Sequence, residues 1–221
     1  MRKSTLIAVV GALMVGCSGG NSGNSQSGET AKKYNPADYL KEDVVKRQVN
    51  GLFKAVEADQ KAGKTTEELV GKYCTADFAK LYKESKALED KYIATLPKWE
   101  DGTPDFGDGW YPLSYVDPWG MRDSGELKEL EEMTVSDLSA EKGTAKASFT
   151  VGCYVPSTEE CPDCDGWNYT PMEVELCLKD TTWQISNITH VREQEESGDR
   201  DFIEVMNMTI KGEGVVPVDG K

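Results

Sequence analysis

Apolar residues recur at helical spacing through the part of the chain between residues 35 and 62. They stand three or four positions apart and so form one stripe along a helix; the stripe consists of Val45, Val49, Leu52, Phe53 and Val56. At the start of this segment Asn35 can cap a helix, Pro36 suits its first turn, and Asp38 suits its positive end. The pattern predicts a helix from this point to about Ala62.

Two more helices are predicted before residue 95. Thr65 and Glu68 have the spacing of a capping box, in which each side chain accepts a hydrogen bond from the other residue's backbone N–H. Thr75 can cap the helix that follows. The apolar residues of the two segments again fall on one face each: Leu69, Val70 and Tyr73 in the first, and Phe78, Leu81, Tyr82, Leu88 and Tyr92 in the second.

From residue 133 the apolar positions alternate with polar ones, which is typical of strands with one buried face. The alternating positions are Met133 and Val135, then Phe149, Val151, Cys153 and Val155, then Met172, Val174, Leu176 and Leu178. Turns are expected at Glu141–Gly143 and at Asp180–Thr182, followed by a last strand from Trp183 to about Val191. The segments read as an antiparallel meander.

Helices followed by an antiparallel meander indicate an α+β fold in which N-terminal helices pack on a curved antiparallel sheet. We expect a single domain over residues 35–192. The remaining residues, 193–221, are interpreted as a C-terminal extension in which Phe202 to Ile210 can form an added strand, either on the sheet edge or with a partner.

Between the two patterns, from Pro97 to Gly125, the chain has no period and is rich in Gly, Pro, Asp and aromatic residues. A loop of this length that carries so many aromatics generally binds or covers something. The candidate ligand-binding residues are Trp99, Trp110, Tyr111, Tyr115 and Trp119, with Asp117 as a polar contact. The alternative is that the aromatics fill the core, and both interpretations remain open at this point.

The N-terminus has the features of an export signal. Arg2 and Lys3 precede an apolar run from Leu6 to Val15, which is too short to cross a bilayer. The run ends in Gly16-Cys17, which resembles the lipobox of bacterial lipoproteins. We therefore predict a signal peptide over residues 1–16, acyl chains such as palmitate on Cys17, and a flexible tether over residues 17–34.

The membrane is thus an expected partner through the lipid on Cys17. Ser18 in the second mature position resembles lipoproteins sorted to the outer membrane, so we expect the protein in the cell envelope, facing the periplasm or exposed at the surface. The chain carries 39 acidic against 25 basic residues, a formal net charge of −14. Such a charge makes nucleic acid an improbable partner.

The order of helices, loop and sheet, ending in Trp183–Ile188, resembles the cone-shaped fold of nuclear-transport-factor-like and cystatin-like proteins. The segments Leu69–Phe78 and Tyr115–Trp119 are similar to an uncharacterised family of Gram-negative, Bacteroides-like lipoprotein domains with that fold. The resemblance implies a cone whose open end can hold a small molecule. Because the superfamily contains enzymes, binding modules and structural partners, it implies no particular activity.

Five cysteines follow Cys17 in a chain expected in an oxidising compartment: Cys74, Cys153, Cys161, Cys164 and Cys177. A structural disulfide between Cys161 and Cys164 is the favoured interpretation, and their two-residue spacing leaves thiol redox chemistry as an alternative. Another alternative is a zinc site built from Cys153, Cys161, Cys164 and Cys177. Strand parity opposes it, because Cys177 should point away from the face that Cys153 shares with the core. Cys74 should pack as a small apolar group.

His190 is the only histidine and is expected at the surface or at a strand edge. We assign no catalytic residue and expect no cofactor. The preferred function is a non-catalytic module that binds a small ligand or a protein; the alternatives are an envelope enzyme with its active site in the cone pocket and a structural zinc protein. Converging polar groups with perturbed pKa values in the pocket would favour the enzyme, whereas aromatics and few acids would suffice for a binder.

Overall fold

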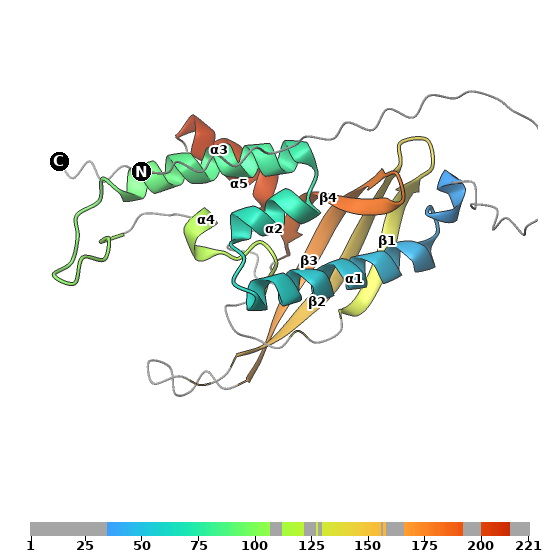
Figure 1. Ribbon diagram of the computed structural model, residues 1–221, viewed down its shortest axis with the longest axis horizontal. Helices are drawn as coiled ribbons and strands as arrows, with labels where there is room; N and C mark the ends of the chain where they lie inside the picture. The colour runs from blue at the N-terminus through green and yellow to red at the C-terminus, as the bar shows by residue number, and fades with distance from the viewer. Residues whose placement is uncertain are drawn as a thin grey trace, which may run out of the picture. The chain divides into compact units, whose positions relative to one another are not determined.

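The computed structural model describes residues 35–106, 112–121, 127, 130–155, 157, 166–191 and 200–212 (Figure 1). They belong to one compact unit, Tyr34–Lys221. The predicted signal peptide, Cys17 and the tether lie outside the described residues. No helix in the described part of the chain is long and apolar enough to cross a membrane.

The predicted N-terminal helices are present as α1 (Glu42–Lys61), α2 (Thr66–Tyr73) and α3 (Ala76–Ile93). The predicted start of the first one is wrong, because Pro36–Asp38 forms a separate 3₁₀ turn, η1, and the chain is extended again at Lys41 before α1 begins. The capping box of Thr65 and Glu68 is confirmed, and the Thr75 side chain accepts a hydrogen bond from the Phe78 N–H.

Four of the five strands form the predicted meander: β1 (Glu131–Ser139), β2 (Thr144–Val155), β3 (Gly166–Lys179) and β4 (Thr182–His190). A two-residue strand, β5 (Arg200–Asp201), continues the sheet, whose order is β1-β2-β3-β4-β5 with every pairing antiparallel. The α+β class predicted from the sequence is therefore confirmed.

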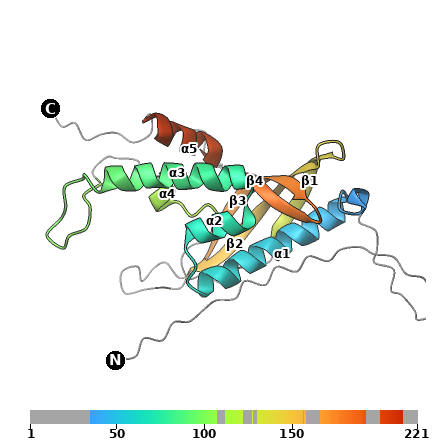
Figure 2. The same cartoon turned by 45° about the horizontal axis from the view of Figure 1, so that its top comes forward.

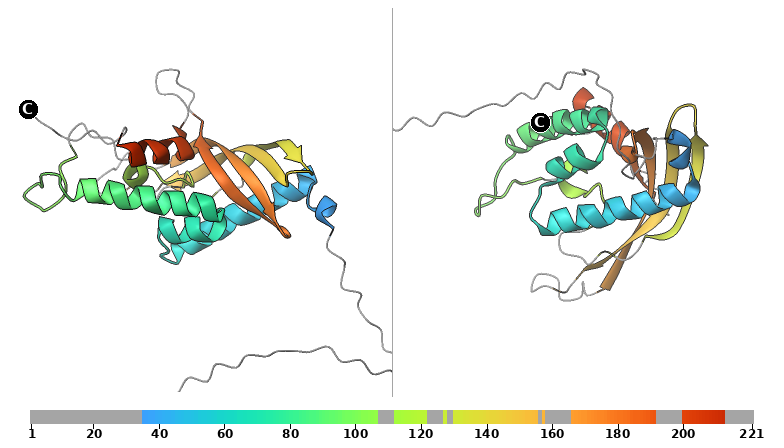
Figure 3. Two further views of the ribbon diagram at one scale, coloured as in Figure 1. Left: turned by 90° about the horizontal axis from the view of Figure 1, so that it is seen from above. Right: turned by 45° about the vertical axis from the view of Figure 1, so that its right-hand side comes forward.

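The helices lie against one face of the sheet (Figure 3), and the core fills the space between them. Helix α1 contributes Val45, Val49, Phe53 and Val56, and the inner face of the sheet contributes Ala147, Phe149, Val174, Ile185 and Ile188, all of them buried. The opposite face is polar: Lys146 of β2 and Glu173 of β3 form an ion pair there at 2.8 Å. This arrangement follows from the alternation of the strands, since only one face had apolar side chains to bury.

The predicted added strand at Phe202–Ile210 is wrong, because this segment forms helix α5 (Phe202–Lys211). Asp201 caps it by accepting the Glu204 N–H at 3.0 Å, and Gly212 ends it in the left-handed conformation. The buried residues follow helical spacing: Phe202, Val205, Met206 and Thr209. Helix α5 runs beside α3 (Figure 2) and joins the core, so residues 200–212 of the predicted extension pack with the domain.

The aromatic segment between the helices and the sheet holds a one-turn helix, α4 (Pro112–Tyr115). The buried carboxylate of Glu89, on α3, accepts the Leu113 N–H at 3.1 Å and so satisfies a donor that the start of this helix leaves open. Burial raises the pKa of Glu89, partly offset by the nearby polar groups of Ser114 and Leu113. Glu89 therefore fixes α4 against the long helix α3.

Candidate functional site

A pocket of about 590 Å³ lies between the inner face of the sheet and the segment that follows α4. The sheet side of the pocket is formed by Asn168 and Thr170 of β3, His190 of β4 and Arg200 of β5. The other side is formed by Thr66 of α2 and by Leu113, Ser114, Val116, Asp117 and Gly120. Most of these side chains are polar, so the pocket suits a ligand with several hydrogen-bonding groups.

His190 faces the pocket because β4 contains a bulge. Leu176 of β3 pairs with Ile185, but the preceding residue of β3, Glu175, pairs with Asn187, which leaves Ser186 as an extra residue. Such an insertion exchanges the faces on which the following side chains lie. Without it, His190 would share the outer face with the polar side chains of the sheet.

The histidine ring is held by a hydrogen bond and by an aromatic contact. Its Nε2 lies 3.1 Å from the carbonyl oxygen of Pro118, and because a carbonyl only accepts, Nε2 carries a proton. The ring also meets the edge of Phe202 with centroids 5.2 Å apart. His190 is 8% exposed, so the prediction of a surface or strand-edge histidine is wrong. The prediction failed because the bulge in β4 turns His190 to the inner face of the sheet.

Asp117 shapes the other side of the pocket. Its Oδ1 accepts the Trp119 N–H at 3.2 Å and its Oδ2 accepts the Met121 N–H at 2.9 Å, which turns the chain back over the sheet. Gly120 completes the turn with φ +66°, and a Cβ on it would stand 2.9 Å from the Met172 sulfur. The positive φ favours glycine at this position, and the short distance shows that the segment rests directly on β3.

The aromatic candidates do not form the lining that the sequence suggested. Trp119 is fully buried and packs edge-on against Phe53 and Tyr73, with ring centroids 6.1 and 6.2 Å apart. Trp99 is 61% exposed, in the turn after α3, and does not line the pocket. Of the predicted set, Asp117 is found in the lining. Trp110, Tyr111 and the side chain of Tyr115 lie outside the described residues.

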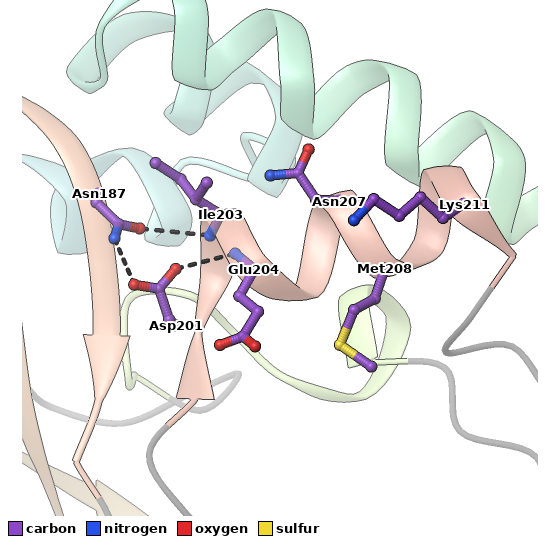
Figure 4. A pocket seen from close by; sticks show the side chains of 7 residues that line it. All are labelled: Asn187, Asp201, Ile203, Glu204, Asn207, Met208 and Lys211. Carbon is purple, nitrogen blue, oxygen red and sulfur yellow. Dashed lines mark hydrogen bonds between the residues drawn. The ribbon is translucent and has the colours of Figure 1, made fainter.

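A second groove, of about 610 Å³, runs along helix α5 (Figure 4). Its polar groups have structural roles: the Asn187 amide donates to Asp201 at 2.7 Å and accepts the Ile188 N–H at 2.8 Å, while Asp201 caps the helix. The Glu204 and Lys211 side chains at its rim are exposed. We therefore place the candidate site in the pocket on the inner face of the sheet.

The described cysteines do not gather into one site. Cys153 pairs with Asn168 across β2 and β3, whereas Cys177 pairs with Thr144. Nine positions along β2 separate the two, or about 30 Å at the rise of a strand. One zinc ion cannot hold both, so the four-cysteine site is excluded. Cys161 and Cys164 lie outside the described residues, and Cys74 is buried as predicted.

No metal site is found among the described residues, in the sense that nowhere do three or more His, Cys, Asp or Glu side chains come together as potential ligands. Comparison with family models, with curated proteins and with solved structures gave no match. The function must therefore be argued from the pocket itself.

Of the lining residues, sequence reasoning named Asp117 alone, and it missed the whole sheet side of the pocket, which consists of Asn168, Thr170, His190 and Arg200. The positions of Asn168 and Thr170 could have been found, because they continue the inward alternation of Met172 and Val174 beyond the apolar part of β3. The other two had no local signal. His190 depends on the bulge, and Arg200 depends on a short strand that exists only through its pairing with β4.

Proposed function

We propose that this protein is a lipid-anchored envelope lipoprotein whose domain binds a small polar molecule without converting it. The observation that carries the binding proposal is the pocket of about 590 Å³ between β3–β5 and the segment after α4. Its volume is in the range of small-molecule sites. Its lining is rich in amide, hydroxyl and charged groups, which suits a hydrogen-bonding ligand.

Binding is favoured over catalysis by the hydrogen bonds that the acidic group in the pocket makes. Both oxygens of Asp117 accept backbone N–H groups of the turn that it stabilises. A carboxylate whose two oxygens are both used to hold a turn has a structural role and is a poor candidate for a general acid or base. Its role is to shape the wall.

The binding test is an NMR titration of the chain from residue 17 onward with Cys17→Ser, against a library of sugars, amino acids, nucleosides and small organic acids. A ligand of the pocket should shift the backbone amides of Gly120, Thr170 and His190. Asn168→Trp should fill the pocket and abolish these shifts. Glu175→Trp is the matched control, because it lies on the same strand but on the opposite face.

The binding proposal fails if no compound moves these amides, or if Asn168→Trp leaves the shifts unchanged while both variants keep a folded spectrum. The anchoring proposal has a separate test. Mass spectrometry of the protein from a Gram-negative host should find acyl chains on residue 17, and Cys17→Ser should release the protein from the membrane fraction. A soluble wild-type protein would overturn it.

An enzyme remains the second candidate, because one observation favours it. His190 and Arg200 share the pocket with Asp117, and converging polar groups of this kind are common in active sites. The test is to incubate each ligand found by NMR with the protein and look for a product. A product that His190→Gln abolishes while binding persists would establish catalysis.

A further inference from the structure

The charged side chains of the pocket balance each other and already have partners in the protein. The described lining contains one acid, Asp117, and one strong base, Arg200, so their formal charges cancel. The two oxygens of Asp117 accept the N–H groups of Trp119 and Met121, and Arg200 also takes part in an interaction within the protein. A charged ligand would have to displace an existing interaction before it could pair with either group.

Two other polar residues of the lining are used to hold the walls. The His190 ring is buried and donates from Nε2 to the carbonyl oxygen of Pro118. The hydroxyl of Ser114 is hydrogen-bonded to the buried carboxylate of Glu89, which fixes α4. These groups therefore shape the pocket, and the ligand must be recognised by others.

The remaining polar side chains of the lining are uncharged. They belong to Thr66, Asn168 and Thr170. Within the part of the chain that the structure describes, the side chains of Thr66 and Asn168 form no hydrogen bond. The Thr170 hydroxyl donates to the Gly120 carbonyl at 3.5 Å, a long bond that leaves its lone pairs able to accept. Hydroxyl and amide groups both donate and accept, as do the hydroxyl groups of a neutral ligand.

These uncharged groups stand on both walls of the pocket. Asn168 and Thr170 pair with Cys153 and Val151, so both face inward, and they are two positions apart on β3. Two positions correspond to about 7 Å along a strand. Thr66, the first residue of α2, lines the other wall. This spacing favours a ligand that carries hydroxyl groups at several positions.

Resting on the binding function proposed above, we propose that the ligand of this pocket is an uncharged molecule with several hydroxyl groups, of the sugar or sugar-alcohol class, held by Asn168, Thr170 and Thr66. A charged derivative would lose part of its hydration without gaining an open counter-charge. The net charge of −14 acts in the same direction for anions, because it lowers their concentration near the protein and leaves that of neutral molecules unchanged.

The first experiment compares sugars that share a ring and differ in charge. D-glucose, D-galactose, D-mannose and sorbitol are titrated while the amides of Gly120, Thr170 and His190 are followed by NMR. Each sugar that shifts these amides is then compared with its uronic acid, its 6-phosphate and its 2-amino derivative. The neutral sugar should bind about fivefold or more tightly, which is the lower end of the usual effect of leaving a polar group without a partner. The methyl ester of the uronic acid controls for bulk at the same carbon.

The second experiment removes the neutral groups of the pocket one at a time. Thr170→Val keeps the shape but deletes the hydroxyl, and Asn168→Asp replaces the amide by a carboxylate; each should weaken binding of the neutral sugar about fivefold or more. Thr170→Ser, which keeps the hydroxyl, should restore binding to within about twofold of wild type. Thr150→Val is the matched control, because Thr150 pairs with Pro171 on the outer face of the sheet and does not line the pocket.

Three results would overturn the inference and leave the binding function standing. One is a charged derivative that binds as tightly as its neutral sugar or more tightly. Another is a pocket that responds to other compounds of the library in the preceding section but to none of the neutral sugars or sorbitol. The third is unchanged affinity in both Thr170→Val and Asn168→Asp. If no compound at all shifts these amides, the binding function itself falls.

Discussion

Two substitutions of Trp119 can separate how much its packing stabilises the fold from how much its buried indole N–H destabilises it. The side chain is fully buried between Phe53 and Tyr73, yet its Nε1 has no hydrogen-bond partner among the described residues. Trp119→Ala should lower the free energy of unfolding by about 3–5 kcal/mol, as is usual for a large aromatic in a core. It should also loosen the wall of the pocket, because the residue lies in the turn that carries Gly120.

Trp119→Phe should cost far less than the alanine variant. The smaller ring leaves a cavity of about 35 Å³, worth about 1 kcal/mol at the usual cost of empty core volume. Against this, the variant removes a buried donor that is unsatisfied, which itself costs about 1–3 kcal/mol. The two effects are opposite and of similar size, so the free energy of unfolding should stay within about 1 kcal/mol of the wild-type value.

The assay is urea unfolding followed by circular dichroism, with the slope against urea concentration compared among the three proteins. Equal slopes show that the change lies in stability and not in the compactness of either state. A loss of about 3 kcal/mol or more for Trp119→Phe, the lower end of what is expected for alanine, would refute the reasoning. It would mean that the indole N–H makes a bond that stabilises the fold.

Three further changes test the capping, the bulge and the buried acid. Thr65→Ala removes the capping box of α2 and should cost about 1 kcal/mol in urea unfolding; an unchanged midpoint would contradict this. Asn187→Ala removes the partners of the Ile188 N–H and of Asp201, should cost about 1–3 kcal/mol, and should shift the His190 amide; stability loss without that shift would separate Asn187 from the pocket. Because burial raises the pKa of Glu89, this side chain binds more protons in the folded than in the unfolded state above pH 4.5, so its contribution to stability should fall as pH rises from there through the raised pKa. Glu89→Gln should flatten that dependence and be at least as stable at pH 7, and a parallel pH curve would contradict the assignment.

The groove along α5 illustrates how structural and functional polar groups can be told apart. In that groove Asn187 and Asp201 bond to each other and to the start of α5, and together they hold the end of β4 next to the bulge. In the pocket on the inner face, Asn168 and Thr170 stand on a strand that has left the apolar core. Asn187 and Asp201 therefore stabilise the fold, whereas Asn168 and Thr170 are available to line the candidate site.

The sequence by itself determined the helices α1 to α3, the four long strands and the α+β class. These elements follow from the spacing of apolar residues, which is 3.6 residues in a helix and 2 in a strand. Such spacing is visible within a short stretch of sequence. The capping box of Thr65 is equally local, since both of its partners lie within one turn. Burial of one face then follows wherever the pattern is regular.

The tertiary structure alone decided the site. The bulge at Ser186 turns His190 inward, and it is fixed by the pairing of β4 with β3 and by the bonds of Asn187 to the start of α5. The segment from Phe202 is apolar enough for a strand, but it becomes a helix because α3 offers it a surface that buries one helical face. Trp119 is in the core because Phe53 and Tyr73, far away in sequence, surround it. Each of these outcomes depends on contacts between distant residues, and no period along the chain encodes such contacts.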